Sequence, residues 1–101
     1  MNQVQPGVAE IADWLNAAAE GRVDRDTADR WAGRWVLDDA LEWDEASWWG
    51  LNKLFGIDLR SGPGEPYLHD DEQVLGWAVE LVERGARAGG VRVRFGLLAH
   101  R

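Results

Sequence analysis

Residues 31–49, WAGRWVLDDALEWDEASWW, constrain the fold of this chain more than any other segment. They include five of the seven tryptophans and five carboxylates. Each buried aromatic side chain removes about 150–250 Å² of surface from water, so these indoles can supply much of the core of a small domain. We therefore expect the core to form around this segment, which joins two helices, with a ridge of negative charge outside.

The length and composition fit a single globular domain. The chain has 101 residues, of which 46% are hydrophobic, and it has no cysteine for disulfides or thiolate metal sites. Its first ten residues lack the basic and apolar regions of a signal peptide. No apolar run approaches the roughly 20 residues that span a bilayer. We expect a cytoplasmic protein without a membrane partner.

Periodic apolar residues predict four helices. After Pro6, residues Val8, Ile11 and Leu15 are at helical spacing, and Gly21 suits the position that ends such a helix. The same reasoning predicts helices at about 6–20, 25–37, 45–55 and 71–84, with Gly56 ending the third. Residues 37–43 either extend the second helix or form a short turn. An acid that can accept hydrogen bonds from free backbone N–H groups stands near the start of the last three: Asp24 or Asp26, Asp44, and Asp70 or Asp71.

The helix at 71–84 has an unusually wide apolar face. Its stripe at Val74, Trp77, Ala78, Leu81 and Val82 is widened by Leu75 and Val79. A helix with so wide an apolar face is expected at the centre of the packing. Gly85 is expected to end it.

The C-terminal residues 85–101 differ from the rest. GARAGG is expected to be flexible, and VRVRF alternates with period two, which is typical of a short strand or an extended arm. We expect this tail to be mobile, paired across a dimer, or docked on the acidic middle of the chain. The sequence as a whole predicts an all-α fold, a four-helix bundle-like single domain over residues 1–84, followed by a short basic extended tail.

The distribution of charge limits the partners that this chain can bind. The net charge is −7, but residues 38–83 alone carry −10 and residues 84–101 carry +5. Nucleic acid is disfavoured, because affinity for phosphates comes from Lys and Arg. A basic protein is favoured, because an acidic surface attracts and steers it.

Catalysis finds little support in the sequence. The histidines are His69 and His100 and the serines are Ser47 and Ser61, and neither serine lies in a nucleophile motif. We therefore predict a protein that is not an enzyme.

The run from His69 to Glu72 resembles a metal site only superficially. Four consecutive residues on a helix point in different directions, whereas helical metal ligands share a face at i and i+3 or i+4. Acids in the first turn are explained by the helix dipole. We expect no metal and no cofactor.

Two segments form the expected partner-binding surface, the acid ridge at 38–45 and 70–72 with its neighbouring aromatic residues. A solvated surface is the alternative for the acids, although ordinary surfaces mix both signs of charge. Trp43 and Trp49 are the indoles that the helical stripes explain least, so at least one of them is a candidate interface anchor. The full set is Asp38, Asp39, Glu42, Trp43, Asp44, Glu45, Trp49, Tyr67, Asp70, Asp71 and Glu72.

The order of these elements resembles the colicin D-type immunity proteins, small acidic helical inhibitors of tRNA-cleaving toxins. VAEIADWLNAAAEGRVDRDTADRW is similar to the first two helices of that family, and GLNKLFG is similar to a later one. Tyr67 and the acids Asp70 and Asp71, followed by EQVLGWAVELVE, are similar to the start of its last helix. The resemblance covers residues 8–84; the arginine-rich tail and the many tryptophans depart from the family.

The resemblance implies an inhibitor whose acids occupy the tRNA-binding groove of a basic nuclease toxin. The alternative is a non-catalytic adaptor or self-associating module, in which the tail of one copy (Arg87, Arg92 and Arg94) docks on the acid ridge of another. We expect a monomer or a weak homodimer: a dimer that depends on the tail would support the second alternative, and a monomer is consistent with the first. For the inhibitor, reversing the charges of Asp70, Asp71 and Glu72 is expected to abolish inhibition without unfolding the domain.

Overall fold

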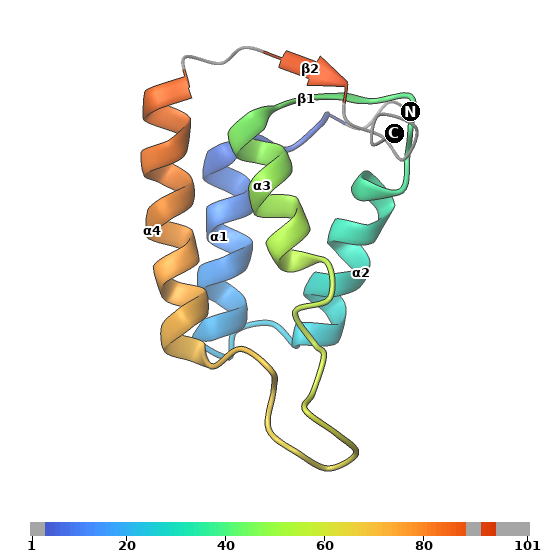
Figure 1. Ribbon diagram of the computed structural model, residues 1–101, viewed down its shortest axis with the longest axis vertical. Coiled ribbons are helices and arrows are strands. Elements are labelled where there is room, and N and C mark those ends of the chain that lie inside the picture. The colour runs from blue at the N-terminus through green and yellow to red at the C-terminus, as the bar shows by residue number, and fades with distance from the viewer. Residues whose placement is uncertain (1–3, 89–91, 95–101) are drawn as a thin grey trace.

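The computed structural model of the chain describes residues 4–88 and 92–94. These ranges contain six elements in the order α1 (Val8–Ala19), α2 (Arg25–Val36), β1 (Glu42–Asp44), α3 (Glu45–Leu54), α4 (Asp71–Ala88) and β2 (Arg92–Arg94). α1, α3 and α4 pack against one another, and α2 packs mainly against α3 (Figure 1). A long loop between α3 and α4 projects from the end of the molecule opposite β1 and β2 (Figure 1). The predicted, mostly helical fold is confirmed.

Two glycines end helices as the sequence predicts. Gly21 follows α1 with a φ of 78°, and the backbone N–H of Arg22 donates to the carbonyl of Ala17 at 2.8 Å. Gly56 follows α3 with a φ of 94°, after which Ile57 turns back into the core. Both φ values lie in the left-handed region, which glycine adopts without steric cost.

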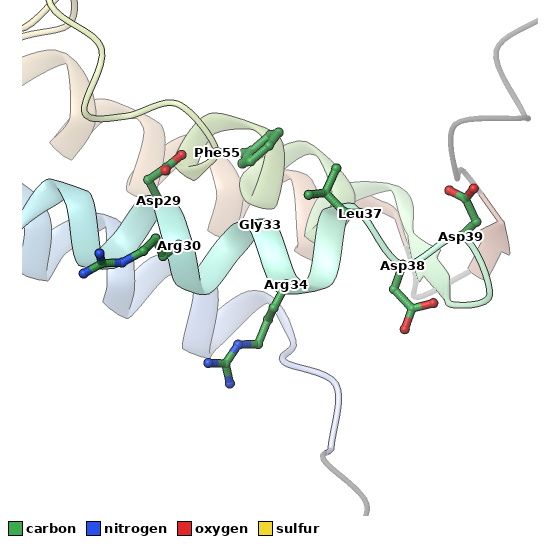
Figure 2. A pocket seen from close by; sticks show the side chains of 8 residues that line it. All are labelled: Asp29, Arg30, Gly33, Arg34, Leu37, Asp38, Asp39 and Phe55. Atoms are coloured by element: carbon green, nitrogen blue, oxygen red, sulfur yellow. The ribbon is translucent and has the colours of Figure 1, made fainter.

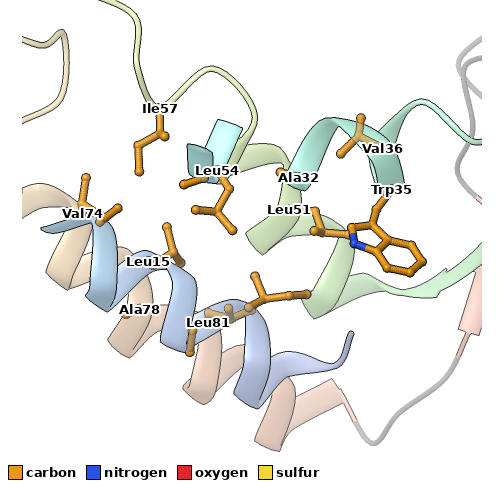
Figure 3. Packing of buried hydrophobic residues seen from close by; sticks show 14 of the residues in the cluster. Leu15, Ala32, Trp35, Val36, Leu51, Leu54, Ile57, Val74, Ala78 and Leu81 are labelled. Carbon is orange, nitrogen blue, oxygen red and sulfur yellow. The ribbon is translucent and has the colours of Figure 1, made fainter. Parts of the chain in front are cut away.

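The core lies where α1, α3 and α4 meet. Ile11 and Leu15 of α1, Leu51 of α3 and Leu81 of α4 are fully buried there (Figure 3). Gly50 allows the close approach of the three helices, since a Cβ at this position would lie 2.8 Å from a methyl carbon of Leu81 and 2.9 Å from one of Ile11. The absence of a side chain at residue 50 therefore sets the spacing of the core.

Four tryptophans form a continuous row from α1 to β1. Trp14 stacks on Trp31 with ring centroids 4.6 Å apart, and Trp31 meets Trp35 edge-on at 6.5 Å. Trp35 then meets Trp43 edge-on at 6.0 Å. Stacked and edge-to-face contacts add to the free energy gained by burying these large rings. The row confirms that the tryptophan-rich segment contributes much of the core.

The predictions for α4 need two corrections. The helix does not end at Gly85 but continues to Ala88. Gly85 faces α1, where an added Cβ would lie 3.0 Å from a methyl carbon of Val8. Nor is α4 central, since Leu75, Val79 and Val82 are exposed. Only the stripe formed by Val74, Ala78 and Leu81 is buried.

Residues 37–43, whose structure the sequence leaves open between an extension of the preceding helix and a turn, form a turn and the first two residues of β1. β1 pairs antiparallel with β2, with Glu42 opposite Arg94 and Asp44 opposite Arg92. Of the three alternatives for the basic tail, these residues take the one in which the tail docks on the acidic middle of the same chain. The remaining tail residues, 89–91 and 95–101, lie outside the described residues.

Two glycine-to-alanine substitutions distinguish a glycine that the packing requires from one that it does not. We expect Gly50→Ala to lower the free energy of unfolding by about 1–3 kcal/mol, because the new methyl overlaps Leu81 and Ile11. Gly76 is a matched control within α4, with nothing within 4 Å of an added Cβ, so Gly76→Ala is expected to raise stability by up to about 1 kcal/mol. Urea denaturation of both variants tests this, and equal effects would contradict it.

Candidate partner-binding site

The predicted acid ridge is not one surface. Residues 38–45 lie at the end of the molecule that carries β1, whereas residues 70–72 lie at the opposite end, where α4 begins (Figure 1). The two groups of candidate residues therefore cannot form a single face. Each is best considered with its own neighbours.

At the β1 end, four of the predicted acids are exposed, whereas Asp44 and Trp43 contribute to the fold. Asp38, Asp39, Glu42 and Glu45 are exposed. Asp44 caps α3 as predicted, accepting a hydrogen bond from the backbone N–H of Ser47 at 2.9 Å.

Trp43 is not an interface anchor, which corrects the prediction. Its ring is 1% exposed and packs edge-on against Trp35. In β1 the side chains alternate, so Trp43 points into the core while the flanking Glu42 points to solvent. Among the described residues, neither Trp43 Nε1 nor Trp35 Nε1 has a hydrogen-bond partner.

At the opposite end, a buried arginine organises the loop between α3 and α4. Arg25 is 4% exposed, and its Nη1 donates to the backbone carbonyls of Ile57 (3.1 Å) and His69 (2.7 Å). Its Nη2 donates to Asp71 Oδ1 at 2.7 Å. A buried guanidinium needs such partners, because desolvation of an unpaired charge is costly. Arg25 therefore connects the start of α2 to both ends of the loop.

Tyr67 and the acids beside it stabilise this end of the fold. The guanidinium groups of Arg25 and Arg60 each lie 4.2 Å from the centroid of the Tyr67 ring. Asp70 caps α4 by accepting from the backbone N–H of Gln73 at 2.8 Å. Since Asp71 binds Arg25, reversing its charge would disturb the fold, contrary to our expectation for the triple change.

A shallow groove on the outer side of α2 has a volume of about 720 Å³. Its apolar part consists of Gly33, Leu37 and the ring of Phe55, which lies 3.2 Å from the position of a Cβ on Gly33. Asp38 and Asp39 lie beyond Leu37 at the end of α2, while Arg34 extends away from Phe55 (Figure 2). The other two lining residues are Asp29 and Arg30. The groove thus joins an apolar surface to the acids of the β1 end.

Trp49, the other candidate anchor, is half-buried in a different hollow. The guanidinium of Arg84 lies 4.4 Å from its ring centroid and the ammonium of Lys53 lies 5.3 Å from it. Lys53 is also 5.1 Å from the centroid of Trp77. These cations already contact the indole, so Trp49 is a weaker candidate than the groove for binding a basic partner.

Three carboxylates that the sequence did not suggest as a group lie together beside the groove. Oxygen atoms of Asp26, Asp29 and Asp58 lie within 4.8 Å of one another. Asp29 accepts from the backbone N–H of Gly56 at 2.6 Å, and Asp26 pairs with Arg30 at 3.0 Å. Two of the three therefore have structural partners within the chain.

Of the residues considered for nucleophilic chemistry, Ser47 and His69 have structural surroundings in the described part of the chain. Ser47 is fully buried, and its hydroxyl has no hydrogen-bond partner among the described residues. The Nδ1 of His69 lies 3.1 Å from Gln73 Oε1, and its ring packs edge-on against Trp77. A nucleophile requires a base within hydrogen-bond reach, and these contacts provide none for Ser47.

Comparison of the chain with protein-family models, with curated proteins and with solved structures finds no match. In residues 4–88 and 92–94, no helix combines the length and the hydrophobicity that crossing a membrane requires.

The sequence did not reveal the roles of Arg25, which holds the loop between α3 and α4, or of Leu37 and Phe55, which line the α2 groove. Arg25 lies off the apolar stripe of its helix, and its burial depends on a loop more than 30 residues away. The sequence places Leu37 and Phe55 at the ends of two predicted helices but does not show that they share a groove. One signal was available for Leu37, because it lies directly between an apolar stripe and two aspartates.

Removing the Arg25 guanidinium is expected to destabilise the protein. Arg25→Met keeps much of the buried aliphatic stem but leaves two carbonyls without a donor, so we expect a loss of about 2–4 kcal/mol in the free energy of unfolding. The control Glu72→Gln changes an exposed acid in the same region and is expected to cost less than about 0.5 kcal/mol. Urea denaturation measures both, and a loss below about 1 kcal/mol for Arg25→Met would contradict the assignment.

Proposed function

We propose that this protein is a non-catalytic binding module that takes a basic protein partner on the α2 groove and the adjoining acids. The observation that carries the proposal is the exposure of Leu37 and Phe55 in a groove beside Asp38 and Asp39. Exposed apolar side chains beside charged ones are typical of protein interfaces.

The chemistry of the groove defines the partner surface that fits it. An apolar side chain would pack between Leu37 and Phe55, and Lys or Arg residues beside it would meet Asp38 and Asp39. Arg34, also in the lining, would donate hydrogen bonds to a carboxylate or a backbone carbonyl of the partner. Charge complementarity of this kind speeds association and weakens as salt increases.

Among basic partners, we propose a nuclease domain, which this protein would inhibit as an immunity-like protein. A nuclease that cleaves RNA binds phosphates with Lys and Arg, and carboxylates can occupy the same cationic groove. The exposed acids Asp38, Asp39, Glu42 and Glu45 support this proposal because they gather at one end of the molecule. In this proposal the acids that mimic phosphates are those of the β1 end, and Tyr67 and Asp71 act only through the fold.

The rival proposal, self-association through the tail, receives less support. It requires the basic tail of one copy to dock on the acidic segment of another. Here Arg92–Arg94 already pairs with Glu42–Asp44 of the same chain. The backbone hydrogen bonds that a tail from a second copy would make to β1 are therefore made within one chain.

Affinity capture with matched variants tests the proposed surface. The immobilised full chain is expected to retain a basic protein from the native lysate at about 50 mM salt and to release it at about 500 mM. Leu37→Ser and Asp38→Lys are each expected to reduce retention of that protein at least about tenfold, because each removes part of the contact.

Two control substitutions lie outside the groove. Leu59→Ser changes a residue 58% exposed, compared with 59% for Leu37, and Glu65→Lys reverses an exposed acid on the projecting loop. Both are expected to retain the protein as the wild type does. Loss of retention in the controls alone would contradict the assignment to the groove.

The nuclease proposal has a separate test. The retained protein is incubated with total tRNA, and cleavage is followed by gel electrophoresis as the wild-type chain is added. We expect cleavage to stop at one equivalent of the wild-type chain and to persist with Asp38→Lys. A retained protein that does not cleave RNA would contradict the nuclease proposal while leaving the binding module intact.

A further inference from the structure

The short strand β2 lies along the edge of β1 and places two arginines opposite two acids (Figure 1). The strands are antiparallel, and the paired positions are Glu42 with Arg94, Trp43 with Val93 and Asp44 with Arg92. Residues 38–45 contain five acids and no base, whereas residues 84–101 contain five arginines and no acid. Opposite charges at paired positions favour an antiparallel pairing by roughly 0.2–1 kcal/mol each. Register and charge therefore both favour this segment at the β1 edge.

Contacts besides those with β2 anchor β1 to the rest of the molecule. The buried ring of Trp43 packs edge-on against Trp35, and Asp44 caps α3. The backbone carbonyl of Glu42 accepts a hydrogen bond from Nε2 of Gln5 at 2.9 Å. A strand edge that is anchored in this way can exchange one paired strand for another, because the incoming strand needs only backbone hydrogen bonds and suitable side chains.

The tail has the chemistry that the α2 groove requires of a partner. Residues 92–94 consist of an apolar residue between two arginines. The basic protein proposed above would likewise bring an apolar side chain with Lys or Arg beside it. The acids that the two would meet are neighbours, since only two residues separate Glu42 from Asp39 of the α2 groove. The tail and a basic partner would therefore compete for the same end of the molecule.

We propose that the edge of β1 is a docking site for a basic, extended segment of the partner, and that the tail of the chain itself fills this site until the partner displaces it. The incoming segment pairs with Glu42–Asp44 in place of β2, and its Lys or Arg residues meet the acids of the β1 end. The inference rests on the proposed function, because it describes what controls access to the same acids.

Tethering determines how strongly the tail competes. A segment of the same chain meets its site at an effective concentration of the order of millimolar, so it excludes the tail of a second copy at lower protein concentrations. A pairing of three residues is nevertheless weak, and the edge opens readily. Only molecules with an open edge bind another strand, so the apparent dissociation constant rises as the open fraction falls.

Fluorescence anisotropy tests the proposal with the full chain and a labelled synthetic peptide of sequence GVRVRFG, which is that of residues 90–96. Two substitutions open the edge by different means. Arg94→Glu puts a like charge opposite Glu42, and Val93→Pro disfavours the strand without changing the charge. Each variant is expected to bind the peptide at least about threefold more tightly than the wild type, because its own tail no longer competes.

Arg22→Glu is the matched control. It makes the same change in net charge as Arg94→Glu at an exposed arginine that β1 does not contact, and it is expected to bind the peptide as the wild type does. Hydrogen exchange at the amides of residues 42–44 is expected to become faster in both opened variants and to stay unchanged in the control. Unchanged exchange in the opened variants overturns the proposal, because β2 would then not protect the edge.

Opened variants that bind the peptide no more tightly than the wild type also overturn the proposal, as does a control that gains as much as they do. The basic protein retained from the lysate is expected to bind both opened variants more tightly than the wild type. Equal or weaker binding overturns the inference and leaves the binding module intact. Retention of no basic protein by any form of the chain, together with the expected peptide result, overturns the proposed function instead and leaves the competition at β1 in place.

Discussion

The buried guanidinium of Arg25 is the interaction on which one whole end of this molecule depends. Three segments meet at it, the start of α2, the turn after α3 and the start of α4, and they are far apart in the sequence. The long loop between α3 and α4 has few apolar contacts of its own, since Leu59 and Leu68 are exposed. Charge-assisted hydrogen bonds to its two ends, with Tyr67 stacked between Arg25 and Arg60, therefore hold it in place.

The contacts around Arg25 also involve two acids that the sequence assigns to the partner-binding surface. Asp70 and Asp71 are engaged as a helix cap and as the partner of Arg25, so their negative charges stabilise the fold. At the other end, Asp38 and Glu45 are exposed beside the α2 groove or at the start of α3. A partner that recognises negative charge would therefore bind at the β1 end, where apolar side chains lie next to the acids.

The local features of the fold could be predicted from the sequence, because they depend on residues close together in the chain. The helical periods, the left-handed glycines at 21 and 56, and the caps at Asp44 and Asp70 belong to this group. Features that depend on distant contacts could not be predicted. The burial of Trp43 depends on Trp35 and on the pairing of β1 with β2, and the role of Gly85 depends on its close approach to Val8 of α1.

The candidate site was predicted in part for the same reason. Composition showed that residues 38–45 are acidic, but only the fold shows that Leu37 and Phe55 share a groove and that residues 70–72 lie at the opposite end. A wide apolar stripe on α4 was visible in the sequence, yet its division into a buried and an exposed half depends on how α1 packs against it.

The most direct test of this account is an NMR footprint of the ¹⁵N-labelled chain with the basic protein that it retains at low salt. We predict that the largest chemical-shift changes fall on the amides of Gly33, Leu37, Asp38, Asp39 and Phe55. The amides around Arg25 and at residues 64–72 are predicted to change little. Changes concentrated at residues 64–72, or the lack of any salt-sensitive basic partner, would contradict the assignment of the binding site to the α2 groove.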